Sequence, residues 1–554
     1  MHHSMKAPLG AVFAVSLALG PSACRSASPS ASDARLYDGY DGYHRAITTR
    51  APQAQRWFDQ GLQLLYGFNH DEAIRSFRRA AELDQGCAMA WWGVAYANGL
   101  HINNPQMSEQ ASRAAWDATQ EALARVERAS PVEQALIRAV AQRYAWPPPA
   151  DRRPLDEAYA AAMEQAWQDF PADADVGALF AESLMNLQPW DLWTRAGEPK
   201  GRTLEIVATL ERVLELDPRH PGATHFYIHA VEASQSPERA VAAAEALSGL
   251  VPGSGHLVHM PSHIWIRTGR YADAADTNER AIAADRAYFA RAPKPDFYSL
   301  YFVHNIHFLA YAAMMEGRYE TARQASRTIE REVPSEFVAE HTRLADGLMS
   351  VPLHVMIRFG RWQDILAEPA PADFRLMSRA LRHYARAIAL ANTARPAEAR
   401  AELAALDGLV GQMDDTWLVG NNQGTAVLAI SRAMAEGEVL FNEGRREEAF
   451  ASLGEAVRLE DELVYDEPPG WMQPVRHALG ALLLVDGRAE EAEQVYRADL
   501  ERHPANGWSL TGLRDALARQ GRESEAAELE PRIASAWARS DERPTVSCFC
   551  AQRG

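Results

Sequence analysis

The chain has 554 residues, of which 47% are hydrophobic and 23% charged, a composition typical of folded proteins that excludes a disordered one. Its length exceeds what one compact core accommodates, so several domains or an elongated repeat architecture are expected. A net charge of −18 disfavours binding to nucleic acid or anionic lipid, and the absence of a GxxxxGK sequence excludes a P-loop nucleotide site.

The first 24 residues have the organisation of an export signal. A weakly basic start, MHHSMK, precedes the apolar stretch APLGAVFAVSLALG, which is too short to span a bilayer. The following PSAC resembles the cleavage box of bacterial lipoproteins, which implies that Cys24 is lipidated and that residues 25–45 form a flexible tether. Pro21 stands where that box usually has leucine, so cleavage by ordinary signal peptidase is the alternative. Both routes predict an exported protein of the periplasm or cell envelope, attached to the membrane only through an N-terminal lipid.

One phrase recurs along the chain and joins pairs of helical patterns. Its glycine tolerates the left-handed conformation that ends a helix, and the acidic residues after it favour the start of the next helix. Each copy therefore predicts a helical hairpin. The copies are TGRYADA (268–274), EGRYETA (316–322), FGRWQDI (359–365), EGRREEA (443–449), DGRAEEA (486–492) and QGRESEA (520–526).

Residues 57–84 resemble the tetratricopeptide repeat family. Trp91 follows Trp57 by 34 residues, which is the period of that family. The resemblance extends in patches over residues 55–530 and implies an all-α solenoid of helix-turn-helix repeats, a superhelix with a concave groove and no sheet. The family's signature positions 4, 8, 11, 20, 24 and 27 are occupied by Trp57, Gly61, Leu64, Ala73, Phe77 and Ala80.

The repeat pattern also predicts how the chain is divided. Two inserts interrupt the first block of repeats, YAWPPPADRRP and NLQPWDLWTRAGEPKG. In the second insert, Trp190 and Trp193 either close over a groove or pack against neighbouring helices. The expected divisions are repeat blocks at 46–205, 206–370 and 371–535, inserts at 144–154 and 186–201, and a loose tail at 536–554.

Histidines recur at matching positions of three consecutive repeats. The register set by the recurring phrase places them at positions 2, 5 and 9 of the first helix, roughly 130° from the packing stripe. In tetratricopeptide proteins this face lines the concave groove. The resemblance therefore implies a groove lined by His225, His229, His256, His259, His263, His304 and His307, with His354 at position 9 of the next repeat.

Several of these histidines have the spacing of metal ligands. Imidazoles four residues apart on a helix project side by side about 6 Å apart and suit one transition-metal ion. Neighbouring helices lie roughly 10 Å apart and can complete the ligand set. A nitrogen-rich lining favours zinc, copper or iron over calcium or magnesium. The expected ligands are His225, His229, His259, His263 and His307.

Two functions remain open at this point. As a scaffold, the protein binds a protein, a peptide or a small ligand in its groove, where histidines also suit hydrogen bonding to a peptide. As a metal-dependent hydrolase or oxidoreductase, it uses the histidines as ligands and acid or base groups, with Glu232 and Tyr311 as the catalytic candidates. Because HExxH, CxxC and GxSxG are all absent, no familiar enzyme signature decides between them.

Overall fold

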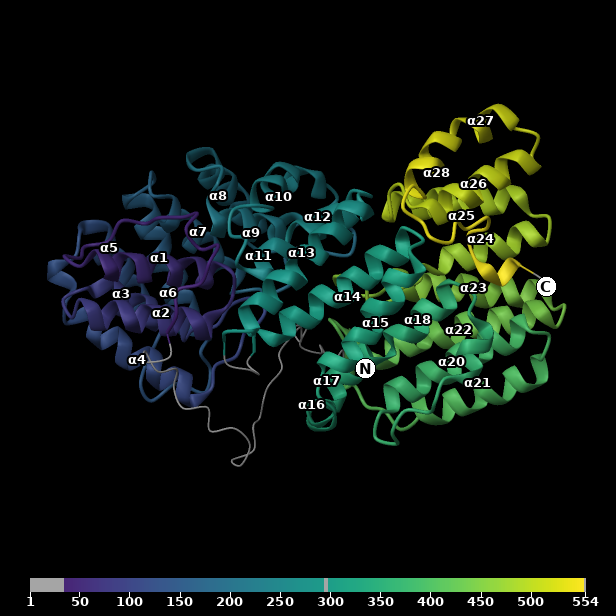
Figure 1. The fold of residues 1–554 in the computed structure, drawn as a ribbon, viewed down its shortest axis with the longest axis horizontal. Helices are drawn as coiled ribbons and strands as arrows, with labels where there is room; N and C mark the ends of the chain where they lie inside the picture. The colour runs from purple at the N-terminus through teal and green to yellow at the C-terminus, as the bar shows by residue number, and fades with distance from the viewer. Residues whose placement is uncertain (1–33, 293–296, 553–554) are drawn as a thin grey trace, which may run out of the picture. The chain divides into compact units, whose positions relative to one another are not determined.

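The computed structural model describes residues 34–292 and 297–552, and their regular structure is almost entirely helical (Figure 1). Cys24 and the rest of the export signal lie outside the described residues. The fold class predicted from the sequence, an all-α solenoid of helix-turn-helix repeats, is confirmed.

The chain divides into two compact units, whereas the repeat spacing predicted three blocks of repeats. Among the described residues, the N-terminal unit comprises residues 34–264, 280–292 and 297–302, and the C-terminal unit comprises residues 265–279 and 303–552. The repeat spacing did not reveal this division because its boundaries fall within continuous helices and not at linkers.

Antiparallel helical hairpins build the N-terminal unit. The predicted inserts correspond to the irregular segments before α6 and before α8. Elsewhere in the unit, short 3-10 helices occupy Val126–Arg128, before α5, and Pro237–Ala240, before α10. The helices are α1 (Pro52–Tyr66), α2 (His70–Leu83), α3 (Ala88–Ala97), α4 (Glu109–Leu123), α5 (Pro131–Val140), α6 (Arg153–Asp169), α7 (Ala174–Met185), α8 (Thr203–Leu216), α9 (Pro221–Val231), α10 (Val241–Leu247) and α11 (Gly255–His259).

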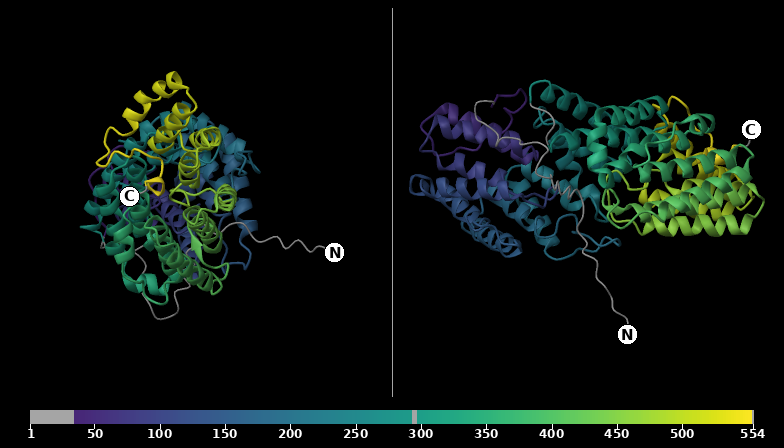
Figure 2. Two further views of the ribbon diagram at one scale, coloured as in Figure 1. Left: turned by 90° about the vertical axis from the view of Figure 1, so that its right-hand side faces the viewer. Right: turned by 90° about the horizontal axis from the view of Figure 1, so that it is seen from below.

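The next three helices contain the boundaries between the units, and the remaining helices belong to the C-terminal unit. Within that unit, α20 to α23 lie side by side (Figure 2). Short 3-10 helices occupy Asp346–Ser350 and Phe549–Ala551. The helices are α12 (Pro261–Arg267), α13 (Tyr271–Phe289), α14 (Ser299–Met315), α15 (Tyr319–Glu332), α16 (Ser335–Glu340), α17 (Thr342–Ala345), α18 (Val351–Arg358), α19 (Trp362–Ala367), α20 (Leu376–Asn392), α21 (Pro396–Val410), α22 (Gly424–Asn442), α23 (Arg446–Asp461), α24 (Val475–Val485), α25 (Ala489–Arg502), α26 (Gly507–Arg519), α27 (Glu523–Glu528) and α28 (Glu530–Ala536).

The first hairpin packs as the tetratricopeptide signature predicts. Phe77 of α2 is fully buried, and a Cβ added at Gly61 of α1 would lie 2.7 Å from its ring. A Cβ added at Gly93 of α3 would lie 2.5 Å from the same ring. Glycine at these two positions lets three helices close around one aromatic side chain, which is why the signature combines glycine with phenylalanine.

The glycines of the recurring phrase adopt the left-handed conformation predicted for them. Each lies between two helices, where a side chain would strain the backbone. The phrase is therefore a reliable marker of a hairpin turn in this chain. The φ angles are +78° at Gly269, +71° at Gly317, +63° at Gly360, +85° at Gly444, +85° at Gly487 and +74° at Gly521.

Two details differ from the sequence expectations. A two-stranded antiparallel sheet, β1 (Leu418–Val419) with β2 (Asn422–Gln423), links α21 to α22, because Gly420 with φ +55° allows a tight turn there. The tail predicted to be loose is packed: Cys550 is buried, and Ser547 donates a hydrogen bond to the carbonyl of His477 at 3.0 Å. Its small and apolar side chains make this packing favourable.

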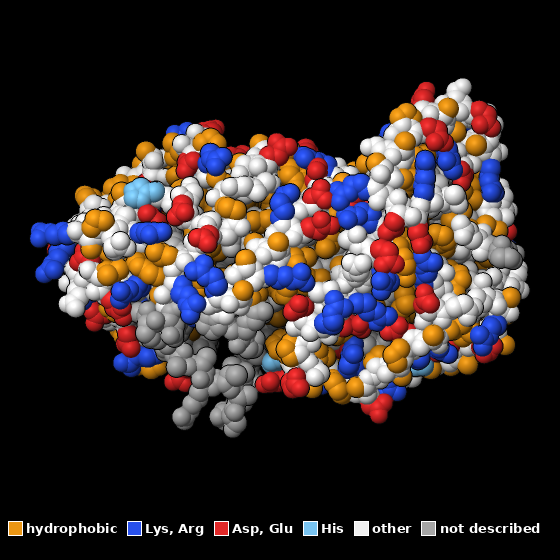
Figure 3. All heavy atoms as spheres, in the orientation of Figure 1, with side chains coloured by type: hydrophobic (Ala, Val, Ile, Leu, Met, Phe, Trp, Pro, Cys, Tyr) orange, Lys and Arg blue, Asp and Glu red, His pale blue; other side chains and the backbone are white. Residues whose placement is uncertain are grey.

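The surface carries both signs of charge. Figure 3 shows acidic and basic side chains interspersed on the face that it draws, with few histidines among them. Within residues 34–292 and 297–552, every helix is too short or too polar to cross a lipid bilayer.

Replacing Phe77 by alanine should lower the free energy of unfolding of the N-terminal unit by about 3–5 kcal/mol, because the three helices around the ring cannot fill the cavity. Urea denaturation measures the change. The matched control is Phe374→Ala, since Phe374 is 46% exposed and its removal should cost much less. Equal effects of the two substitutions would contradict this packing.

Candidate metal centre

Two helical segments of the N-terminal unit carry five buried histidines. His225 and His229 lie one turn apart on α9, with ring centroids 4.9 Å apart. His256 and His259 lie on α11 and His263 on α12, and the rings of His259 and His263 are 4.8 Å apart. The predicted side-by-side pairing is thus present in both segments. All five residues are at most 6% exposed. They therefore do not line an open groove, as the repeat register predicted, because groove residues would be accessible to solvent.

Residues at the helix starts position the two segments that carry the histidines. The side chain of Ser254 caps α11 by accepting from the Leu257 amide at 3.4 Å, and Pro261 begins α12. At the start of α9, a Cβ added at Gly222 would lie 2.5 Å from the Tyr66 ring. Glycine therefore allows α9 to begin directly against the end of α1, which brings its histidines toward the α1–α2 turn.

Three imidazoles form the first group of candidate ligands. One nitrogen from each of His225, His229 and His256 lies within 4.8 Å of the others. The Nδ1 of His225 donates to the Tyr66 carbonyl at 2.7 Å, which leaves its Nε2 as an acceptor 3.2 Å from the Nε2 of His256. The Nε2 of His229 is buried and has no hydrogen-bond partner. Three nitrogens therefore face a shared space.

Glu232 orients two of the histidines. Its carboxylate accepts from Nδ1 of His229 at 2.9 Å and from Nδ1 of His263 at 2.5 Å. Burial raises the pKa of Glu232, but the two histidines outweigh burial and hold the pKa at about 2. The group is therefore ionised. Carboxylates of this kind hold metal-bound histidines in position and fix which ring nitrogen carries the hydrogen.

The remaining imidazole pair has its own hydrogen-bond chain. The Nε2 atoms of His259 and His263 are 2.8 Å apart, and the hydroxyl of Ser262 lies 3.2 Å from Nδ1 of His259. Donation from Ser262 to His259, then from His259 to His263, then from His263 to Glu232 satisfies every member. This pair needs no ion to complete its hydrogen bonding.

Phe68 supplies an apolar wall to the cluster. It lies in the α1–α2 turn with φ +56°, a conformation that costs a residue with a side chain about 1–2 kcal/mol. Its ring stacks on His101 at 4.2 Å and lies 4.6 Å from the ring of His225 and 5.6 Å from that of His256. Backbone strain beside a polar cluster is typical of functional sites.

The second insert packs directly on the histidines. The indole nitrogen of Trp190 donates to Asn103 at 3.1 Å, and the Trp190 ring lies edge-on to His229 at 5.3 Å. Trp193 donates to the carbonyl of Ala230 in α9 at 2.7 Å. On another side, the Tyr301 ring is 4.3 Å from that of His256. Aromatic rings thus surround the first group of ligands.

Sequence reasoning missed much of this surrounding shell. Phe68, His101, Asn103 and Tyr301 come from separate turns and helices, and the repeat register assigns them no special position. The segment HINNP, which contains His101 and Asn103, carried the only sequence signal, because polar side chains there can reach a neighbouring site.

The other candidates from the sequence belong to the C-terminal unit. These are His304, His307, His354 and Tyr311. Burial lowers the pKa of both His307 and His354 to about 4. His354 lies 3.4 Å from the Gln473 side chain and packs against Trp471 at 5.2 Å, so it has an environment of its own.

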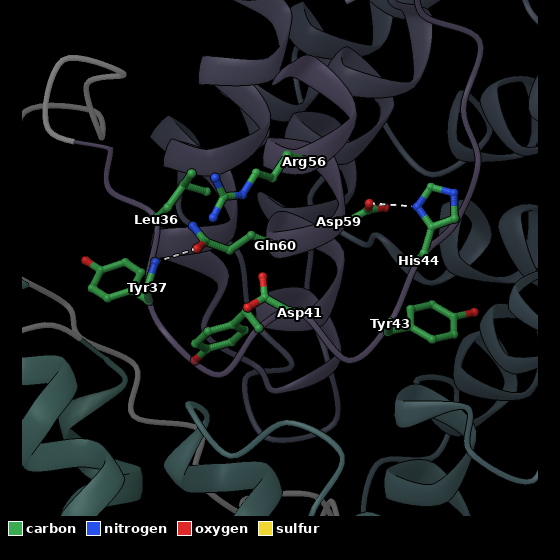
Figure 4. A pocket seen from close by; sticks show the side chains of 9 residues that line it. Leu36, Tyr37, Asp41, Tyr43, His44, Arg56, Asp59 and Gln60 are labelled. Carbon is green, nitrogen blue, oxygen red and sulfur yellow. Dashed lines mark hydrogen bonds and ion pairs between the residues drawn. The ribbon is translucent and has the colours of Figure 1, made fainter. Parts of the chain in front are cut away.

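A separate cavity of about 130 Å³ lies between the N-terminal segment and α1 (Figure 4). Gln60 accepts from the Tyr37 amide at 2.8 Å, and Asp59 pairs with His44 at 2.8 Å. Polar side chains of α1 thus hold an extended segment in place. None of the residues lining this cavity belongs to the histidine cluster.

Comparison with known proteins adds little about function. No family model and no curated relative matches the chain. Among solved structures, it is similar to the human IFIT1 dimer with m7Gppp-AAAA, at 14% identity over 89% of this chain and 92% of that chain, with a TM-score of 0.32. It is similar to the APC/C hetero-tetramer Cut9–Hcn1 at 13% identity over 89% of this chain and 78% of that chain, with a TM-score of 0.29. It is also similar to Naa15/Naa10 bound to HypK-THB at 17% identity over 69% of this chain and 61% of that chain, with a TM-score of 0.26. Identities and TM-scores this low transfer no function to this chain.

The stability of the metal-free protein should fall as the pH drops from 7 to 5. Burial lowers the pKa of His70 to about 3 and those of His101 and His225 well below the usual value, whereas the unfolded chain takes up these protons near pH 6.5. Below pH 6.5 the unfolded state therefore binds more protons, and each such histidine removes up to about 1.4 kcal/mol per pH unit.

Urea unfolding with a chelator at pH 7, 6 and 5 measures this slope. His70→Asn should make the slope shallower. A free energy of unfolding that stays constant over this range would contradict the neutral buried state.

Proposed function

We propose that the N-terminal unit binds a transition-metal ion, zinc, copper or iron, through the Nε2 atoms of His225, His229 and His256. The observation that carries the proposal is the convergence of three buried imidazole nitrogens within 4.8 Å of one another. Imidazole is a common ligand for these metals, and three ligands are a usual number for such a site.

Hydrogen-bond accounting supports an ion at this place. The Nδ1 hydrogens of His225 and His229 are used by Tyr66 and Glu232, so both Nε2 atoms are acceptors. His256 can donate one hydrogen toward His225, which leaves the Nε2 of His229 unsatisfied. A buried acceptor without a donor is costly. A metal ion accepts electron pairs from all three nitrogens and removes this cost.

The site also favours an ion over protons. Burial holds the pKa of His225 far below its usual value, so this ligand is neutral and need not release a proton before it binds metal. The ionised Glu232, 1% exposed, supplies a compensating negative charge through the histidines that it orients. Without that carboxylate, the positive charge of a buried metal ion would be costly, because no negative group would compensate it.

The proposed ligand set differs from the one expected from sequence. His225 and His229 are retained, and His256 replaces His259 and His263, whose hydrogen bonding is complete without an ion. His263 then acts through Glu232, and His307 belongs to the other unit.

A metal-dependent hydrolase or oxidoreductase is the second candidate function. Three protein ligands leave one position of a tetrahedral ion open for water or substrate, as in catalytic zinc sites. The ring of the buried Tyr301 lies 4.3 Å from that of His256, so its hydroxyl would be the nearest phenol donor to a small molecule bound there. A further role as a scaffold for a protein or peptide partner fits the helical repeats, because repeat arrays present extended surfaces.

Wild-type protein supplied with zinc, copper or iron should retain close to one ion per chain after dialysis, measured by elemental analysis. His225→Ala/His256→Ala should lose the ion while keeping its helical circular dichroism. Glu232→Gln should weaken binding by about 10–100-fold without abolishing it, because it acts through the ligands. His383→Ala, in the other unit, is the matched control. Wild-type protein that holds none of the three metals would overturn the proposal.

We propose in addition that the chain is exported as a lipoprotein. Expressed with its leader in a bacterium, the mature protein should begin at a lipidated Cys24 and sediment with membranes. Cys24→Ser should release it in soluble form. Intact-mass spectrometry distinguishes this result from cleavage by ordinary signal peptidase, which would give an unlipidated product, and from retention of the whole leader, which would contradict export.

A further inference from the structure

The C-terminal unit contains a disulfide between two cysteines that are one residue apart. Cys548 and Cys550 belong to the sequence SCFC and are joined through their sulfurs. Cys550 is 6% exposed, and Cys548 is partly exposed. A disulfide stabilises a fold least when the loop that it closes is short. The stability of the unit therefore gives little reason for this disulfide.

The residues around the two cysteines hold them against the helices of the unit. Ser547 donates to the carbonyl of His477 at 3.0 Å, and its hydroxyl lies 2.5 Å from that of Tyr496. Phe549, between the two cysteines, packs against the turn at Gly360, where an added Cβ would lie 2.8 Å from the Cβ of Phe549. The two sulfurs therefore have a defined position beside α22 and α24.

A buried carboxyl group lies beside both sulfurs. Glu438 is in α22 and is 1% exposed. One of its carboxylate oxygens lies within 4.8 Å of the Sγ atoms of Cys548 and Cys550. This separation is within the reach of one bridging water molecule, so a proton can pass between the carboxyl group and a sulfur.

The surroundings of Glu438 favour a group that takes up and releases a proton near neutral pH. Asn392 of α20 donates to one carboxylate oxygen at 2.7 Å, and the other oxygen is buried without a hydrogen-bond partner. Within the part of the chain that the structure describes, no basic side chain pairs with Glu438. Burial raises the pKa of Glu438 to about 7, against a smaller opposite effect of Asn392. Both the acid and the carboxylate are therefore populated at neutral pH.

The two cysteines differ in a way that assigns them different parts in an exchange reaction. Cys548 is the more exposed, so an external thiolate reaches its sulfur more readily. The backbone amide of Cys550 donates to Sγ of Cys548 at 3.1 Å, and such a hydrogen bond stabilises a thiolate at Cys548. Attack at Cys548 leaves the electron pair of the broken bond on the buried sulfur of Cys550, where a proton is needed.

We propose that Cys548 and Cys550 form a redox-active pair that undergoes thiol–disulfide exchange with an external dithiol, and that Glu438 transfers the proton at Cys550. A thiolate of the dithiol attacks Sγ of Cys548, the bond between the two cysteines breaks, and the carboxyl group of Glu438 protonates the sulfur of Cys550.

The second step completes the reduction of the pair. The other thiolate of the dithiol attacks the dithiol sulfur of the mixed disulfide and releases Cys548 as a thiolate. The dithiol becomes a disulfide and loses two electrons, which reduce the pair, and two protons. One proton returns Glu438 to its acid form and the other protonates Cys548. This site belongs to the C-terminal unit, so its test is independent of the proposed metal centre.

Reduction of the full chain by dithiothreitol between pH 6 and 9 tests the proposal. Alkylation with iodoacetamide and mass spectrometry of the C-terminal peptide measure the rate. The wild-type rate, divided by the fraction of dithiothreitol present as thiolate, should fall as the pH rises through about 7, because the acid form of Glu438 is depleted. Glu438→Gln should lower this normalised rate at pH 6 by roughly 10–100-fold and make it independent of pH.

The matched control is Asp466→Asn. Burial also raises the pKa of Asp466 to about 7, but this carboxylate accepts from the Asn421 amide at 2.8 Å, beside the β1–β2 turn. It does not belong to the group of ligand atoms around the two sulfurs. The variant should therefore keep the wild-type rate and pH profile, and helical circular dichroism checks that each variant is folded.

The proposal fails on any of three results. Two of them need no variant to fold: a wild-type disulfide that dithiothreitol does not reduce in the folded protein, and a normalised wild-type rate that stays constant from pH 6 to 9. The third is a Glu438→Gln protein with the wild-type rate and pH profile, because another group would then supply the proton.

Discussion

The hydrogen bond from His225 to the carbonyl of Tyr66 is the contact on which the histidine cluster depends. Tyr66 is the last residue of α1, where helix carbonyls lack partners within their own helix. The imidazole satisfies one of these carbonyls, and in doing so it fixes its own orientation and directs Nε2 into the cluster. The unpaired carbonyl at the end of α1 thus fixes the orientation of His225 on α9, which a metal ligand requires. Gly222 makes this possible by letting α9 approach α1.

The shell around the cluster gives these nitrogens their chemical character. Phe68 places its aromatic ring against His225, and this buried setting disfavours the charged form of that histidine. It also makes any interaction with an ion stronger than it would be in water, because the local dielectric is low. The strained backbone at Phe68 is consistent with a ring that is required at that place. The result is a cluster in which His225 is neutral and one ionised carboxylate, Glu232, lies behind the ligands.

The sequence predicted the local features of the fold well and the long-range features poorly. The recurring phrase located its hairpin turns, because the left-handed glycine requirement is local, and helical spacing correctly paired His225 with His229. Burial could not be predicted, since it depends on segments far apart in the chain. The contact of Trp190 with His229 and the stacking of Phe68 on His101 arise from three turns that the repeat register treats as unrelated. Division into two units escaped detection because its boundaries lie inside helices.

The buried donors and acceptors of the histidine cluster are not balanced. Around His225 and His229, buried acceptors outnumber donors, because Tyr66 and Glu232 use both Nδ1 hydrogens. A species with empty orbitals and positive charge completes such a site. Because an unmatched buried acceptor costs free energy, this imbalance indicates that the missing ligand is positively charged.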